Sequence, residues 1–247
     1  MYIMGCTIMN RRLSMVNNIM KELQALSDPE KAEFLPRFFK TLPGGYAEGD
    51  IFIGVTVPKI RSVAKKYHAL PFTQIRQLLR SPIHEHRLAA LLILADRFGS
   101  SDETAKERIA EFYLHNLNYV NNWDLVDLSA DKVLGAYLFS RDRSILYSLC
   151  KTGHLWSQRV AIISTFFFIR RGQFEDTFRI AGHLLGHKHD LIHKAVGWML
   201  REVGKRDREA EELFLKKHYR SMPRTMLRYA IEKFSPEERQ RYLKGLV

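Results

Sequence analysis

The sequence predicts an all-α protein in which antiparallel helix pairs stack into a superhelix. Three observations support this class. Apolar residues recur with a helical period along almost all of the 247 residues, the alternation typical of β-strands is nearly absent, and Pro and Gly breaks divide the chain into short segments. Apolar residues make up 46% of the chain, which is enough to bury a core.

Helix-start signals mark several of the segments. Ser27-Asp28-Pro29-Glu30 supplies a capping residue, a proline in the first turn and an acid three residues after the serine. Ser81-Pro82 and Ser235-Pro236 repeat this arrangement. The breaks predict about fourteen helices of about ten to nineteen residues. In chain order they span residues 12–26, 29–41, 58–68, 72–80, 82–98, 102–119, 123–138, 142–151, 155–171, 173–186, 190–203, 207–220, 223–233 and 236–246.

One stretch interrupts the helical pattern. Residues 41–56, TLPGGYAEGDIFIGVT, contain Gly44, Gly45, Gly49 and Gly54 and predict an irregular loop, with room for extended pieces. Loops carried on a rigid array of helices are a common place for functional residues.

Helix pairs of about 35–40 residues have the period of HEAT and armadillo repeats. The sequence repeat itself is weak, so this class rests on the spacing of the helices. We expect one HEAT-like helical-repeat domain over residues 1–247, with residues 1–10 as a frayed tail. Such an array closes its own core, and we therefore expect a monomer.

Charge is distributed unevenly along the chain. There are 39 Lys and Arg against 27 Asp and Glu, a formal net charge of +12. The stretches Ile51–His84 and Arg143–Phe174 contain no acid. Because one-sign stretches on helices create basic faces, a polyanionic partner is indicated, above all DNA. A scaffold for protein partners is the less favoured alternative, since it would present an apolar or mixed-charge surface.

Composition also argues against several classes. Cys6 and Cys150 are the only cysteines, which indicates no disulfide framework and a reducing cytoplasm. No apolar run reaches the roughly 20 residues of a membrane span. The apolar N-terminus is too short for a signal peptide, and no apolar segment precedes Cys6 as a lipidation box requires. Paired histidines at positions 183 and 187 and at 189 and 193 lack a third ligand, and His84-Glu85-His86 does not match HExxH. We expect neither a metal nor a cofactor.

The three tryptophans have informative spacings. Trp123 stands four residues before Asp127, which places both side chains on one face of a helix. Trp123 and Arg159 are 36 residues apart, and Arg159 and Trp198 are 39 apart. Both distances match the expected repeat, so equivalent places on neighbouring layers bring Trp123, Asp127, Arg159 and Trp198 to one side of the superhelix.

Asp124 and Asp127 have different expected roles. If Asn122 caps the helix, Asp124 lies in the first turn, where it stabilises the positive helix end. Asp127 shares a largely apolar face with Trp123, Ala130 and Leu134. A carboxylate there is costly unless it is paired or used, so Asp127 is either a buried acid tied to a backbone amide or to Arg159, or a functional carboxylate. We favour the functional role.

Five segments in order resemble the AlkD-type DNA alkylation repair proteins, which are HEAT-like DNA glycosylases. They are IGVTVPKIRSVAKKY (53–67), NNWDLVDLSADKVLG (121–135), LWSQRVAII (155–163), HKAVGWMLREVGK (193–205) and MPRTMLRYAIEKF (222–234). The resemblance runs from about residue 15 to the end. It implies excision of positively charged N3- and N7-alkylated purines from double-stranded DNA in base-excision repair.

The resemblance also assigns roles to residues. Asp127 matches the catalytic carboxylate, Trp123 and Trp198 match the aromatic residues beside the deoxyribose of the lesion, and Arg159 matches the active-site arginine. Tyr46 is the nearest candidate for an N-terminal tyrosine of the family. Further DNA contacts are expected at His115, Lys194, Arg201, Lys65 and Lys66.

The chemistry agrees with these assignments. Breaking the glycosidic bond of a cationic purine develops positive charge on the sugar, which a preorganised carboxylate and indole faces stabilise. The resemblance further implies that the lesion is handled through its sugar and backbone, without a base-specific pocket. The alternative is a non-catalytic binder of damaged or branched DNA on the same fold, which would be expected to lack the Asp and Trp pattern.

Overall fold

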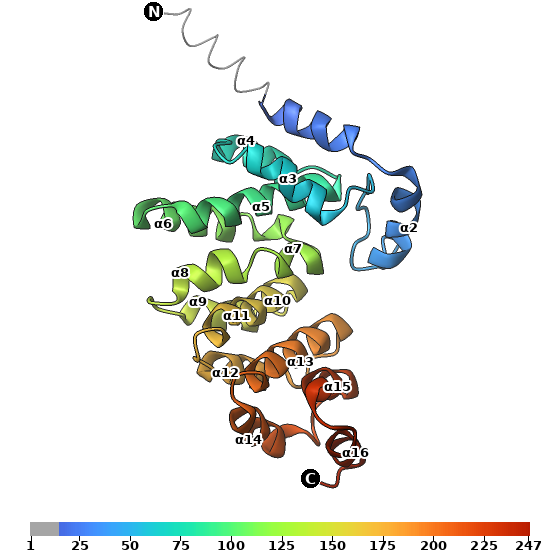
Figure 1. Ribbon diagram of the computed structural model, residues 1–247, viewed down its shortest axis with the longest axis vertical. Helices are drawn as coiled ribbons and strands as arrows, with labels where there is room; N and C mark the ends of the chain where they lie inside the picture. Colours follow the sequence, from blue (N-terminus) through green and yellow to red (C-terminus); the bar gives the residue numbers. More distant parts are fainter. Residues whose placement is uncertain (1–14) are drawn as a thin grey trace, which may run out of the picture. The chain divides into compact units, whose positions relative to one another are not determined.

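The computed structural model describes residues 15–247 (Figure 1). Helices account for the regular structure of this part of the chain, where the only β pairing is an isolated bridge between Ile51 and Ile83. The predicted all-α helical-repeat class is confirmed. The tail predicted at residues 1–10 and the site considered at Cys6 lie outside the described residues.

The chain divides into two compact units, Met1–Ser129 and Ala130–Val247. In the first unit residues 15–25 are helical. Its other helices are α2 (Pro29–Phe39), α3 (Val57–Lys66), α4 (Phe72–Leu79), α5 (His84–Ser100), α6 (Glu103–His115), a 3-10 turn (Leu117–Tyr119) and α7 (Trp123–Asp127). Helix α5 is the core of this unit, because it is buried almost throughout its first three turns and packs against α3, α4, α6 and α7.

The second unit is built around α13. It contains a π-helical turn (Asp131–Gly135), α8 (Ala136–Leu138), α9 (Ser144–Lys151), α10 (Leu155–Ser164), α11 (Phe166–Ile169), α12 (Glu175–Leu184), α13 (Asp190–Gly204), α14 (Arg208–His218), α15 (Arg224–Ala230), a 3-10 turn (Ile231–Lys233) and α16 (Pro236–Lys244). Helix α13 packs against α12 and α14, its neighbours in sequence, and against α10 and α15 of the adjacent layers. This pattern is typical of stacked helix pairs.

Helix starts follow the capping signals closely. Asp28 accepts a hydrogen bond from the Lys31 amide at the start of α2, and Ser235 and Glu238 form a capping box on α16. At Ser81-Pro82 the helix begins later than predicted, at His84, because the Ser81 hydroxyl accepts the Ile83 amide and holds a turn ahead of α5.

The prediction of one continuous helix over residues 123–138 is wrong. Helix α7 ends at Asp127, and the chain resumes as a π-helical turn in which the Gly135 amide donates to the Ala130 carbonyl at 2.9 Å. A Cβ at Gly135 would lie 2.3 Å from the Ser164 carbonyl oxygen, so the close approach of these two segments requires glycine. Because the helix breaks, the apolar face expected to run from Asp127 to Leu134 is not continuous.

Two other predicted helices are shorter than expected. The segment 155–171 divides into α10 and α11, and the Ser164 and Thr165 hydroxyls at the junction donate to the Val160 and Ile162 carbonyls, each at 2.7 Å. The segment 102–119 ends as an α-helix at His115, where the Asn116 side chain donates to the Phe112 carbonyl at 2.7 Å. Such side chains compete with the backbone for hydrogen bonds and bend or end helices.

Candidate active site

Helix α7 carries the two candidate catalytic residues of the first unit, Trp123 and Asp127, one turn apart. The buried Asn122 caps this short helix, since its side-chain oxygen accepts the Trp123 amide at 2.8 Å. Asp124 accepts the Leu125 amide at 2.9 Å, in the first turn where a carboxylate is favoured. Five residues are too few to hold a helix in water, so its position depends on tertiary contacts.

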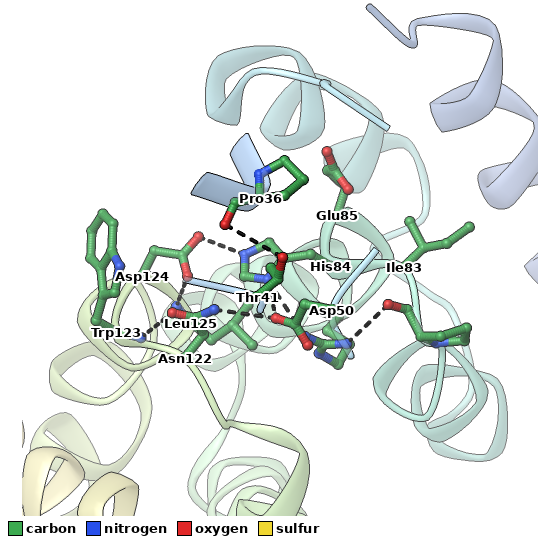
Figure 2. Close-up of polar contacts among 12 residues, drawn as sticks. Pro36, Thr41, Asp50, Ile83, His84, Glu85, Asn122, Trp123, Asp124 and Leu125 are labelled. Carbon is green, nitrogen blue, oxygen red and sulfur yellow. Dashed lines mark hydrogen bonds and ion pairs between the residues drawn. The ribbon is translucent and has the colours of Figure 1, made fainter. Parts of the chain in front are cut away.

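The main contact is a buried ionic cluster around His84 (Figure 2). His84 is the first residue of α5, and its Nε2 lies 2.8 Å from Oδ2 of Asp124 while its Nδ1 lies 3.1 Å from Oδ2 of Asp50. Side-chain exposure is 3% for His84, 5% for Asp50 and 11% for Asp124. One imidazole therefore joins α7 to the end of the irregular loop.

Two further side chains complete this cluster. Arg87 Nη2 lies 2.6 Å from Oδ1 of Asp50, and the Asn122 amide donates to Oδ2 of Asp50 at 3.2 Å. The Arg87 guanidinium also donates to the carbonyls of Ser81 and Pro82. Buried charges need compensation of this kind, and with His84 protonated the cluster holds two anions and two cations.

The protonation of this cluster follows from its geometry. Burial lowers the pKa of His84, but the attraction of Asp124 and the hydrogen bonds to Asp124 and Asp50 outweigh burial and raise the pKa to about 9. Burial raises the pKa of Asp50, yet the hydrogen bond from His84 and the charge of Arg87 bring that pKa below its usual value. His84 is therefore the protonated partner of both carboxylates at neutral pH.

Sequence reasoning missed this cluster. His84-Glu85-His86 was considered only as a metal motif, and the segments that carry Asp50, His84 and Asp124 are far apart along the chain. In residues 15–247 no group of three or more His, Cys, Asp or Glu is placed to hold a metal ion. The one available signal is the polar run His84–Arg87 directly before the apolar stretch Leu88–Leu94, because such side chains need polar partners once they are buried.

Trp123 lies on an aromatic cluster formed by α2 and the irregular loop. Its ring stacks on Phe39 at 5.2 Å with an interplanar angle of 9°, and the Phe38 ring meets it edge-on at 6.0 Å. Phe39 in turn stacks on Phe52 at 4.8 Å, and Phe52 stacks on His84 at 4.6 Å. The rings thus connect the indole to the ionic cluster.

Tyr46 packs against this same aromatic cluster, as Trp123 does. Its hydroxyl lies 3.5 Å from the Phe38 carbonyl, and the Lys40 ammonium lies 6.0 Å from its ring centroid. The assignment of Tyr46 as the N-terminal tyrosine of the family remains a prediction. Phe38, which no sequence motif indicated, is the aromatic residue that meets the Trp123 ring edge-on.

Glu85 holds the end of the irregular loop. Its Oε1 accepts the amides of Gly54 at 2.8 Å, Ile53 at 3.1 Å and Val55 at 3.3 Å. Gly54 has a φ of +81°, and a Cβ there would lie 2.2 Å from the Asp28 carbonyl oxygen. The predicted loop is therefore irregular in backbone but anchored on α5 and α2.

Arg159 and Trp198 belong to the second unit, on the adjacent helices α10 and α13. Arg159 is only 4% exposed, and its Nη1 donates to the Leu191 carbonyl. Trp198 is half-buried, with its Nε1 donating to Oε1 of Glu202 at 3.2 Å and its ring 5.7 Å from that of Phe166. The grouping of Trp123, Asp127, Arg159 and Trp198 in one site remains a prediction.

Comparison with known proteins places the chain in a family. The family model described as DNA alkylation repair enzyme matches residues 19–234. The chain belongs to the DNA alkylation repair enzyme family. A solved structure described as a predicted DNA alkylation repair enzyme from Enterococcus faecalis has the same fold, with a TM-score of 0.64 and 16% identity over 85% of this chain and 97% of that chain. No curated protein matches the sequence significantly.

Membership of the DNA alkylation repair family supports an enzyme with a role in alkylation repair and DNA as its partner. The expected DNA contacts of this family member lie in both units. Lys65 and Lys66 are exposed in the last turn of α3, where Lys66 pairs with Glu22 at 2.9 Å. His115 is exposed in the last turn of α6, and its Nδ1 lies 2.7 Å from the Glu111 carbonyl.

In the second unit of this alkylation repair protein both expected phosphate contacts have acidic partners. Lys194 pairs with Asp190 at 2.8 Å, and Arg201 pairs with Glu232. Arg201 is mostly buried, so a phosphate would have to displace Glu232 to reach it, whereas Lys194 is more accessible.

No helix in the described part of the chain is long and apolar enough to cross a membrane.

Proposed function

We propose that this protein is a DNA glycosylase that hydrolyses the N-glycosidic bond of positively charged N3- and N7-alkylated purines. The observation that carries the proposal is the pairing of Trp123 and Asp127 on one face of a capped helix that a buried ionic cluster holds in place, in a chain of the alkylation repair family. A rigidly placed carboxylate beside an indole is suited to stabilising a cationic sugar.

In the proposed reaction the leaving base takes the electron pair of the glycosidic bond and becomes a neutral purine. The sugar becomes oxocarbenium-like, and Asp127 stabilises this charge and positions the attacking water, which adds at the anomeric carbon and releases a proton. The Trp123 and Trp198 rings contact the deoxyribose, and Arg159 holds a phosphate or orients Asp127. The placement of Trp123 and Asp127 on α7 supports their part of this assignment, and the roles of Trp198 and Arg159 rest on the resemblance to the family.

Selectivity in this mechanism arises from the substrate. A cationic alkylpurine is already a good leaving group, so the enzyme needs to stabilise only the sugar. Asp124 does not compete with Asp127 for the catalytic role, because its carboxylate is bound to His84 and to the Leu125 amide. Asp124→Asn is therefore a matched control for the neighbouring carboxylate.

The test is release of free base from DNA that carries N7-methylguanine or N3-methyladenine. We expect the wild type to release base and Asp127→Asn to lose at least about a hundredfold in single-turnover rate, while DNA binding survives. Asp124→Asn is expected to lower the free energy of unfolding, because it weakens the contact with His84, and to lower the single-turnover rate less than Asp127→Asn does. Salt-sensitive DNA binding without any base release by the wild type would replace the glycosylase with a non-catalytic binder of damaged DNA.

A further inference from the structure

Helix α2 presents an apolar stripe to solvent. Phe34 is 62% exposed, Phe38 is 54% exposed and Leu42, just beyond the helix, is 71% exposed. The spacing of four residues places Phe34 and Phe38 on one side of α2, and Leu42 follows two residues after the left-handed C-cap Lys40. We call these three residues the α2 stripe. Isolated exposed apolar residues are ordinary, but an aligned set that borders a candidate site indicates binding.

The rings of the α2 stripe continue the aromatic cluster under Trp123. Phe34 stacks on Phe38 at 6.2 Å with an interplanar angle of 26°, and Phe38 meets Trp123 edge-on at 6.0 Å. Phe38 also packs edge-on against the buried Phe39 at 5.2 Å. In the α2 stripe, Phe38 is therefore held by Phe39 and Trp123, and Phe34 extends the aromatic surface into solvent. The stripe starts beside Trp123, the residue proposed to contact the sugar.

Charge near Phe38 favours a polyanion. The exposed acids Glu30 and Glu33 precede Phe34, whereas from Phe34 to Ala47 the sequence contains no acid and two cations, Arg37 and Lys40. Both are exposed, and Lys40 follows the last residue of α2 with a left-handed backbone, φ 54°. Aromatic faces flanked by cations are the arrangement by which proteins hold the bases and phosphates of unpaired strands.

We propose that the α2 stripe binds an unstacked nucleobase of the DNA engaged by Trp123 and Asp127. This inference rests on the proposed function, which makes DNA the ligand. It adds a binding site for a base that has left the stack of the double helix. The base lies on an open face of Phe34 and Phe38, with its flanking phosphates toward Arg37 and Lys40. A protein partner fits less well, since a stable interface buries roughly 800 Å² on each side, more than three side chains supply.

The experiment compares two duplexes without alkylated bases, one fully paired and one that differs from it only by a single bulged 2-aminopurine. No cleavable lesion is present, so binding is measured apart from excision. The wild type is expected to bind the bulged duplex more tightly than the paired duplex, and its binding should change the fluorescence of the bulged 2-aminopurine. Phe34→Ser should weaken binding to the bulged duplex roughly fivefold or more, and Phe34→Ser/Leu42→Ser further, with binding to the paired duplex unchanged.

Leu213→Ser is the matched control, because Leu213 is 63% exposed on α14 and lies outside the stripe. It should leave both affinities unchanged. Circular dichroism and thermal unfolding check that each variant folds as the wild type does.

Three results would overturn the inference: no DNA binding by the wild type, an unchanged preference for the bulged duplex in Phe34→Ser, or a wild-type dimer in sedimentation velocity that Phe34→Ser dissociates. The last result would assign the stripe to a second copy of the chain. A loss of bulge preference in Phe34→Ser would support the stripe even if the wild type released no base, and the glycosylase proposal alone would then fail.

Discussion

Trp123 and Trp198 stand in different surroundings. In the first unit, the Trp123 ring stacks on Phe39 and the start of its helix is bound to a histidine whose side chain is almost wholly buried. In the second, Trp198 donates to Glu202, a buried carboxylate whose other partners, Lys205 and Arg206, are partly exposed to water. We call the first ionic cluster dry, because its cations His84 and Arg87 are buried, and the second hydrated, because its cations Lys205 and Arg206 are partly exposed.

This difference shows how two candidate site residues of one chemical type can be positioned by unlike means. A short helix such as α7 cannot position Trp123 by its own backbone hydrogen bonds, so the cluster around His84 does so. Helix α13 has fifteen residues packed against α10 and α15 and needs no such support. Ionic groups beside Trp198 are therefore accessory.

The largest expected effect comes from breaking the dry cluster. His84→Leu would leave Asp50 and Asp124 without their shared partner in a buried place, and we expect a loss of about 3–5 kcal/mol in the free energy of unfolding. Urea unfolding measures this loss. The control is His68→Leu, since His68 pairs with Asp96 at 3.0 Å but both side chains are about half exposed, and under about 1 kcal/mol is expected. Equal losses in the two variants would show that the buried His84 cluster and the exposed His68–Asp96 pair contribute alike to stability.

A second expected effect is a fall in stability with rising pH. The pKa of His84 is about 9 in the folded protein, whereas an unpaired histidine titrates near pH 6.5. The folded state keeps a proton that the unfolded chain releases over this interval. The stabilisation is thus complete below about pH 6.5 and is lost by about pH 9, on the order of 3 kcal/mol.

Unfolding in urea at pH 6, 7.5 and 9.5 checks this dependence. The wild type should lose more stability across the series than His84→Gln, because glutamine does not titrate. Parallel pH dependences for the two proteins would show that His84 gains no proton affinity on folding.

The smallest expected effect lies beside Trp198. Glu202→Gln keeps a hydrogen-bond acceptor for the indole but removes the negative charge shared with Lys205 and Arg206. We expect a loss of about 1 kcal/mol at low salt that shrinks as salt rises, because the partners are accessible to water. Unfolding at low and high NaCl measures it. A loss as large as that of His84→Leu, independent of salt, would mean that the two regions are held alike.

Much of the fold was predictable because it depends on local signals. Apolar periodicity and caps such as Asp28 and Ser235 indicated the helices, and the loop at 41–56 followed from its glycines. The breaks within 123–138 and 155–171 were not predicted, because they arise from the approach of Gly135 to Ser164 and from hydroxyl groups that compete for backbone carbonyls. The first is a tertiary effect and the second is local, but neither leaves a periodic signature in the sequence.

The candidate site was predictable to a similar degree. The spacing of Trp123 and Asp127 on a single helical turn is local and is present in α7. The cluster of Asp50, His84 and Asp124 joins three distant segments, so no spacing rule indicates it. The contact of Phe38 with Trp123 was not predictable either, because an aromatic residue on a helix predicts packing but does not indicate which ring it will contact.

Glu85 has a consequence for how this sequence can diverge. It binds the amides of Ile53, Gly54 and Val55, so these hydrogen bonds do not depend on the side chains at positions 53 and 55, which are buried and need only stay apolar. Gly54 is excepted, because its backbone faces the Asp28 carbonyl. Over evolutionary time the exposed side chains of the loop can therefore change, while one acid and one glycine preserve the course of its main chain.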